Sequence, residues 1–89
     1  MGRGIQWDGD AWEDYCAWQR TDKDTLKRIN ALIQDARRDP FDGIGKPEPL
    51  KHDLSGLWSR RINEKDRLTY KLVNDVLVIL ACKGHYGDK

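Results

Sequence analysis

The sequence has few cysteines and histidines and no long apolar run, and each shortage narrows its range of functions. Only Cys16 and Cys82 occur among the 89 residues, they form no CxxC pair, and there are only two histidines. The chain therefore lacks a zinc-type ligand cluster, so we expect no metal site, and we expect both thiols to be reduced. No segment approaches the roughly 18–20 apolar residues of a membrane span. No apolar segment follows Met1 as in a secretory signal, so we expect a cytoplasmic protein with no membrane partner.

The length and composition predict one small folded domain covering residues 1–89. Hydrophobic residues make up 38% and charged residues 35%, and the mean hydropathy is −0.83. Four Trp, three Tyr and one Phe nevertheless argue against a disordered chain. The formal net charge of +1 does not by itself indicate a nucleic-acid partner.

The first half of the chain predicts a short strand and two helices. Residues 5–7 alternate like a strand, and a helix is expected over residues 9–19 with Asp8 as its N-cap. Thr21 or Asp22 is expected to cap a second helix that ends before Pro40. The apolar stripe of that helix is Leu26, Ile29, Leu32, Ile33 and Ala36. Trp12 and Trp18 are expected in the core of this helical hairpin.

The second half predicts strands over residues 57–62, 67–73 and 76–82, because the apolar period changes from 3.6 to 2. Asn74 and Asp75 form a two-residue turn, and the last strand is apolar enough to be buried on both faces. The fold class is therefore α+β, with two N-terminal helices packed on one face of a twisted antiparallel sheet.

Glu48 is the first candidate for chemistry. It is one of only three Glu in the chain and lies between Pro47 and Pro49, which fix the backbone on both sides. It is either a loop carboxylate that pairs with Lys46 or Lys51, or a general base held in a fixed geometry.

Three arginines are candidates for binding an anion. Arg60, Arg61 and Arg67 lie on two strands joined by a short loop, so two guanidinium groups could converge on one phosphate. If Ile62 pairs with Arg67, Arg60 shares the face of Arg67. A three-residue loop or a bulge would pair Arg61 with Arg67 instead. The alternative is a solvated charged face.

The C-terminal Gly84-His85-Tyr86 segment follows the most apolar strand. An imidazole can exchange a proton near neutral pH, and a Tyr hydroxyl can orient a phosphate or stack on a base. The alternative is a frayed tail. Together with Glu48 and the arginines, these groups suit phosphodiester cleavage without a metal. His52 is interpreted as a surface residue, and Trp58 as a residue that could serve an interface.

A long string of residues gives the sequence a family resemblance. Residues 40–62 read PFDGIGKPEPLKHDLSGLWSRRI, and residues 12–15, 26–30, 66–70 and 81–86 fit the same pattern. Over roughly residues 5–86 the chain resembles the YoeB/Txe family, toxins of type II toxin–antitoxin systems within the RelE-like mRNA interferase superfamily.

The resemblance implies a small bacterial ribonuclease that enters the ribosomal A site, cuts mRNA there and needs no metal or cofactor. It implies neutralisation by a YefM-like antitoxin, and members often form homodimers. By matching position, the family's catalytic residues are Glu48, Arg67, His85 and Tyr86. Lys51 and Arg61 are the matching substrate-binding residues.

The sequence departs from the family pattern in three places: residues 1–4 are less apolar, Gly84 replaces a larger residue, and residues 87–89 extend the chain. None of these changes removes a catalytic group. Two rival functions remain: a ParE-like poison of DNA gyrase, and a non-catalytic module that only binds an antitoxin.

Overall fold

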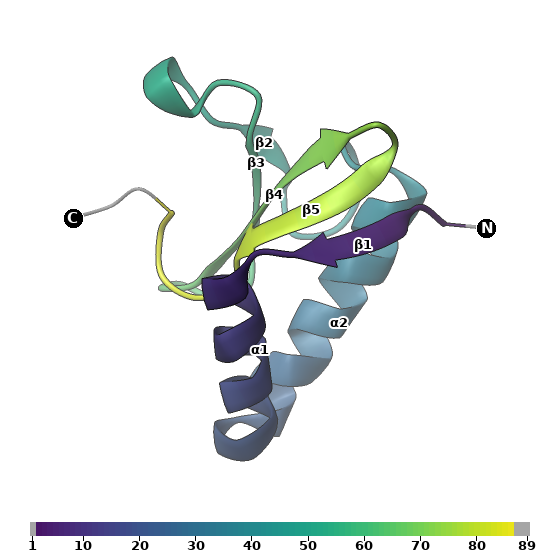
Figure 1. The fold of residues 1–89 in the computed structure, drawn as a ribbon. Helices are drawn as coiled ribbons and strands as arrows, with labels where there is room; N and C mark the ends of the chain where they lie inside the picture. The colour runs from purple at the N-terminus through teal and green to yellow at the C-terminus, as the bar shows by residue number, and fades with distance from the viewer. Residues whose placement is uncertain (1, 87–89) are drawn as a thin grey trace.

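The computed structural model describes residues 2–86, which form two helices beside a five-stranded sheet (Figure 1). The elements, in chain order, are β1 (Gly4–Trp7), α1 (Gly9–Thr21), α2 (Lys23–Arg38), β2 (Glu48–Pro49), the 3₁₀ turn η1 (His52–Leu54), β3 (Trp58–Arg61), β4 (Arg67–Val73) and β5 (Val76–Ala81). The α+β class is as the sequence predicts. Residues 87–89, which extend the chain past the family pattern, lie outside the described residues.

The sheet is mixed rather than wholly antiparallel, and this corrects the expected topology. Its strand order is β1-β5-β4-β3-β2, and β1 pairs with β5 in parallel while the other neighbours are antiparallel. Periodicity predicts that residues 5–7 form a strand, but it cannot tell where that strand inserts. The helices α1 and α2 lie between β1 and the later strands in sequence, and β1 forms the edge of the sheet beside β5.

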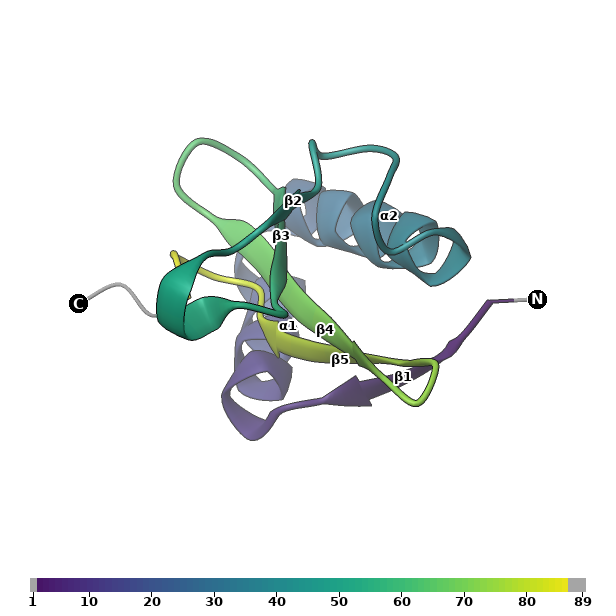
Figure 2. The same ribbon diagram turned by 90° about the horizontal axis from the view of Figure 1, so that it is seen from above.

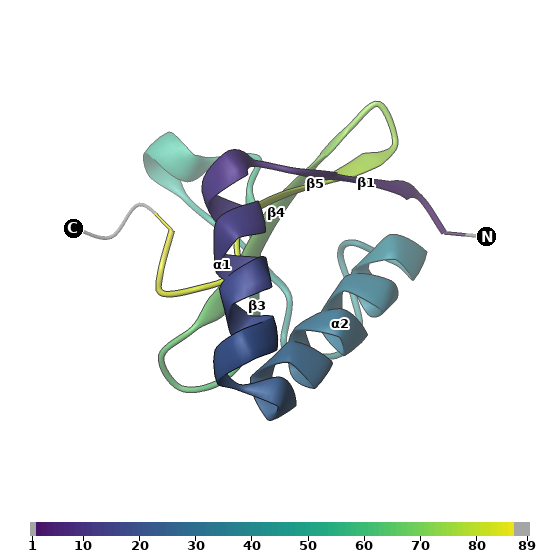
Figure 3. The same cartoon turned by 60° about the horizontal axis from the view of Figure 1, so that its bottom comes forward.

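Both helices cover the same face of the sheet, as Figure 3 shows by bringing them in front of it. Asp22 caps α2 with its side chain, which accepts a hydrogen bond from the Thr25 amide at 3.1 Å. Asp8 takes the N-cap position of α1 but makes no capping side-chain bond. The predicted stripe of α2 is buried at Ile29, Leu32, Ile33 and Ala36. Neither helix in residues 2–86 is long and apolar enough to cross a membrane.

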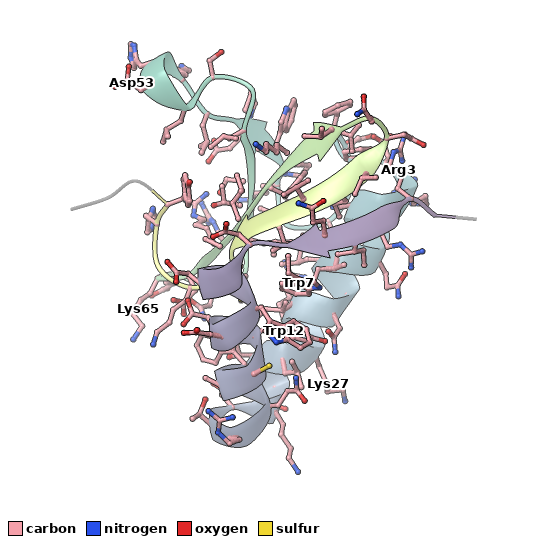
Figure 4. The ribbon with its side chains drawn as sticks, viewed as in Figure 1. Arg3, Trp7, Trp12, Lys27, Asp53 and Lys65 are labelled. Atoms are coloured by element: carbon pink, nitrogen blue, oxygen red, sulfur yellow. The ribbon has the colours of Figure 1, made fainter. Side chains whose placement is uncertain are left out.

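The aromatic residues of the helical hairpin are less buried than expected. Trp18 is half-buried and packs against the core, but Trp12 is 48% exposed, so its assignment to the core was wrong. Trp12 instead meets Trp7 of β1 edge-on, with ring centroids 5.6 Å apart (Figure 4). This happens because Ala11, the neighbouring residue of α1, takes the position that faces the core.

The last strand is also more open than expected. Leu77 and Ile79 are fully buried on the helix side. On the opposite face, which neither α1 nor α2 covers, Val78 is buried at the centre of the strand, but Val76 and Leu80 are only half-buried. The two cysteines are free thiols, as expected. Burial raises the pKa of Cys82 to about 12, so this thiol is a packing group and not a nucleophile.

A buried arginine ties the loop after α2 to the rest of the fold. Arg60 is fully buried, and its Nε donates to the Tyr70 hydroxyl at 2.9 Å while its Nη1 contacts Asp35 of α2 at 2.7 Å. Its remaining bonds go to three loop carbonyls, those of Asp39, Asp42 and Ile44. The loop that leads toward β2 is therefore fixed by side-chain bonds rather than by regular secondary structure.

We predict that Asp35→Asn lowers the free energy of unfolding by about 2 kcal/mol at neutral pH. Arg38 and Arg60 hold the pKa of the Asp35 carboxyl down at about 2. The carboxylate therefore stabilises the fold fully above pH 4, and this contribution disappears as pH falls toward 2. Urea denaturation from pH 7 to pH 2 measures it, and the two proteins should converge at the acid end.

Asp75→Asn is the matched control, because Asp75 pairs with Arg3 on the surface and is 76% exposed. Its effect should stay within about 0.5 kcal/mol. An Asp35→Asn variant as stable as the control at pH 7 would contradict the assigned role of the Arg60 network.

Candidate functional site

The candidate residues gather on the face of the sheet that the helices leave open. Strand partners share a face, and β2, β3 and β4 are paired so that Glu48 is opposite Ser59 and Arg61 is opposite Arg67. Glu48 was expected in a loop but begins the two-residue strand β2. The short edge strand therefore carries the carboxylate alongside the arginines.

Glu48 forms an ion pair with Arg67, with 3.0 Å between Oε1 and Nη1. The interpretation that it pairs with Lys46 or Lys51 is therefore wrong. The Glu48 side chain is 56% exposed and that of Arg67 is 20% exposed. The pair therefore lies at the surface, and the arginine is the more buried of the two partners. The carboxylate remains open to a ligand on its other side.

The register decides between the two arrangements of the arginines. Arg61 is opposite Arg67 on the open face, as in the second arrangement, but residues 62–66 join the two strands rather than a three-residue loop. Arg60 is opposite Leu68 and points into the core, where it forms the network with Asp35. Two like charges directly across a strand pair repel each other, so this face favours an anion.

The C-terminal segment is bonded to the same part of the sheet. The Arg67 amide donates to the Gly84 carbonyl at 3.0 Å, and the Gly84 amide donates to Asp66 Oδ1 at 2.9 Å. His85 and Tyr86 come next and are both exposed. The segment is therefore anchored up to Gly84, directly beside Arg67, and is not a tail that frays from β5.

Lys51 lies on the segment that projects from the body of the fold. It precedes η1, whose tip carries Asp53 at the upper left of Figure 4. This segment and the C-terminal segment lie on the same side of the sheet in Figures 1 and 2. No carboxylate in residues 2–86 pairs with Lys51 or Arg61. Arg61 lies opposite Arg67, whereas Lys51 is placed only by its position three residues after Glu48. His52 is exposed, as predicted.

Arg67, which pairs with Glu48, has one side-chain nitrogen without an acceptor in residues 2–86. Its Nε is buried and has no hydrogen-bond partner among the described residues. Because this nitrogen is closed to solvent, a phosphate oxygen would be bound by the part of the guanidinium that is exposed, beside Glu48. In the part of the chain that the structure describes, no three His, Cys, Asp or Glu side chains gather as metal ligands would.

Sequence reasoning missed Asp66 altogether, and it named Arg60 only as a candidate for binding an anion, although both residues hold the site in place. Arg60 could have been identified because it alternates with Trp58 and Ile62, which are apolar and face the core. Asp66 follows Asn63 by three residues, a spacing typical of a side-chain-bonded turn. Its contact with Gly84 is long-range and has no signal in the local sequence.

Comparison with known proteins agrees with the geometry. Residues 7–86 match the family model described as YoeB-like toxin of bacterial type II toxin–antitoxin system. Toxin YoeB of Escherichia coli K12 is 59% identical over 80 residues, which cover 90% of this chain and 95% of that protein.

Solved structures give the same result. A YoeB/ParE toxin from Agrobacterium tumefaciens superposes with a TM-score of 0.91 at 45% identity, covering 93% of this chain and 99% of that one. The YoeB dimer from Staphylococcus aureus has a TM-score of 0.88 at 41% identity, and the heterotetrameric YoeB–YefM complex from the same species has one of 0.87 at 41%. Each covers 97% of this chain and is itself fully covered. The chain therefore belongs to the YoeB-like toxins of bacterial type II toxin–antitoxin systems.

Proposed function

We propose that this toxin is an endoribonuclease that cuts mRNA in the ribosomal A site and thereby stops translation. The observation that carries the proposal is Arg67, whose guanidinium contacts the Glu48 carboxylate and whose backbone holds Gly84 beside it. A carboxylate, an arginine and an imidazole within one small region are the groups that phosphodiester cleavage requires.

The proposed reaction uses the RNA's own 2′-hydroxyl as the nucleophile. Its oxygen forms a bond to the adjacent phosphorus while the bond from phosphorus to the 5′-oxygen breaks, leaving a 2′,3′-cyclic phosphate and a 5′-hydroxyl. Glu48 accepts the 2′-OH proton, and His85 donates a proton to the departing 5′-oxygen. Arg67, with Arg61 and Lys51, stabilises the charge that grows on the phosphate oxygens. Tyr86 orients the phosphate or packs on a base.

Primer extension on mRNA bound to translating ribosomes tests the proposal as a whole. We expect a cut within the A-site codon that appears only when toxin and ribosome are both present. A toxin that leaves mRNA intact but blocks supercoiling by DNA gyrase would replace this proposal with the ParE-like function. Inertness in both assays would favour a module that only binds an antitoxin.

The proposed partners are mRNA, the ribosome and a YefM-like antitoxin, and the site of action is the bacterial cytoplasm, where translation occurs. The YoeB–YefM complex and the YoeB dimer of Staphylococcus aureus support an antitoxin partner and a homodimer for this chain.

We predict that Glu48→Gln and His85→Gln each reduce mRNA cleavage by about 10²–10⁴-fold, because each change removes one proton transfer. Both variants keep size and polarity, so ribosome binding should persist. Glu64→Gln, on the exposed β3–β4 loop, is the matched control and should cut at the wild-type rate. Near wild-type cleavage by either site variant would remove that residue from the acid–base chemistry.

Arg67→Ala should slow the chemical step more than it weakens ribosome binding. The phosphate carries more charge in the transition state than in the ground state, so the guanidinium acts mainly there. Single-turnover rates at saturating ribosome concentration measure the step directly. A change confined to the concentration dependence would make Arg67 a docking residue.

A YefM-like antitoxin should protect the C-terminal segment. The open face carries Arg61 and Lys51 without carboxylate partners in residues 2–86, so an acidic, partly apolar segment can cover it. Hydrogen exchange at residues 81–86 should slow when the antitoxin is added, and thermal stability should rise. If toxicity is blocked while these amides exchange equally fast, neutralisation occurs elsewhere on the toxin.

A further inference from the structure

The loop between β3 and β4 contains a carboxylate that the proposed reaction does not use. Asp66 is only 7% exposed, although aspartates of such loops are ordinarily solvated. We propose that Asp66 is a positioning residue that holds the C-terminal segment, and with it His85 and Tyr86, beside Arg67. This inference rests on the proposed function and adds a residue to it.

Asp66 is itself fixed by the loop that carries it. Asn63 Oδ1 accepts the amides of Lys65 and Asp66, both at 2.8 Å, and Asn63 Nδ2 donates to Asp66 Oδ2 at 3.0 Å. The Asp66 carbonyl also accepts the Ile62 amide at 3.0 Å. The carboxylate therefore has one orientation, and its Oδ1 is left for a partner outside the loop.

That partner is the amide of Gly84, at 2.9 Å from Oδ1. Gly84 is held from its other side as well, because its carbonyl accepts the Arg67 amide at 3.0 Å. Consecutive residues of β4 and its loop thus bind both backbone groups of the residue that precedes His85. Gly84 has a φ of +65°, a left-handed conformation that turns the chain away from the line of β5.

No other bond among the described residues fixes the chain after Gly84. Trp18 Nε1 donates to the Cys82 carbonyl at 3.0 Å, which secures the end of β5 but not the turn that follows. The two bonds of Gly84 are therefore the last polar contacts before His85, and the bond to Asp66 is the one that a side-chain substitution can remove. Its loss should let His85 move relative to Arg67, and displacements of about 1 Å can cost roughly a hundredfold in rate.

The experiment compares three changes at this loop. Asp66→Ala removes the acceptor. Asp66→Asn replaces one carboxylate oxygen with an NH₂ group, which must face either the Gly84 amide or the Asn63 NH₂ group. Since both of those groups are donors, one of the two bonds is lost. The double variant Asn63→Asp with Asp66→Asn exchanges the two side chains. It restores every bond and leaves the net charge unchanged, since the new carboxylate accepts from Lys65, from the residue 66 amide and from the new side-chain NH₂. Asp75→Asn serves as the surface control.

Two readouts are measured on the full chain: the single-turnover rate of mRNA cleavage at saturating ribosome concentration, and hydrogen exchange at the Gly84 amide. We expect Asp66→Ala to cut at least tenfold more slowly than wild type with ribosome affinity unchanged, and to exchange faster at Gly84. Asp66→Asn should be intermediate, and the double variant should recover both values. Asp75→Asn should match wild type.

A wild-type rate for Asp66→Ala would overturn the positioning role. So would a double variant as slow as Asp66→Ala although its Gly84 amide is again protected, since the charge of Asp66 would then matter rather than its bond. If wild-type toxin does not cut mRNA, the proposed ribonuclease function fails. Unchanged Gly84 exchange in Asp66→Ala would then show that the bond does not hold the segment either.

Discussion

The structure depends on one buried cation, the guanidinium of Arg60. Burying a charge costs several kcal/mol unless it is paired, and here all three guanidinium nitrogens have acceptors. Those acceptors come from α2, from β4 and from the loop that leads to Glu48. The strand that carries Glu48 has only two residues and could not hold its own position. The candidate site is therefore built outward from a core salt bridge rather than from apolar packing alone.

Most of the secondary structure could be predicted because its signals are local. The α2 stripe ending at Ala36 and the alternation of Leu68 and Tyr70 each reflect one buried face. The family assignment was also available, since the string over residues 40–62 is long. Of the residues predicted for the site, Glu48 and Arg67 are in direct contact. Gly84, which precedes His85, is bonded to the backbone of Arg67.

The remaining features depend on contacts between distant parts of the chain. Whether Arg60 or Arg61 shares a face with Arg67 depends on a single residue of register, and the sequence does not show at which residue the strands end and the loop begins. Trp12 has the spacing of a core residue, yet Ala11 is the residue of α1 that is fully buried, and Trp12 packs against Trp7 instead. The Asp66–Gly84 bond joins residues that no periodicity relates.

The pairing of β1 with β5 has a consequence for how the chain folds during its synthesis. A chain emerges from the ribosome from its N-terminus, so β1 has no sheet partner until β5, which follows every other described element in sequence, has emerged. The anchoring of Gly84 waits for the same moment. A chain that has not yet made β5 thus has neither a closed sheet nor an anchored Gly84, so the order of synthesis makes the candidate site one of the last parts of the fold to form.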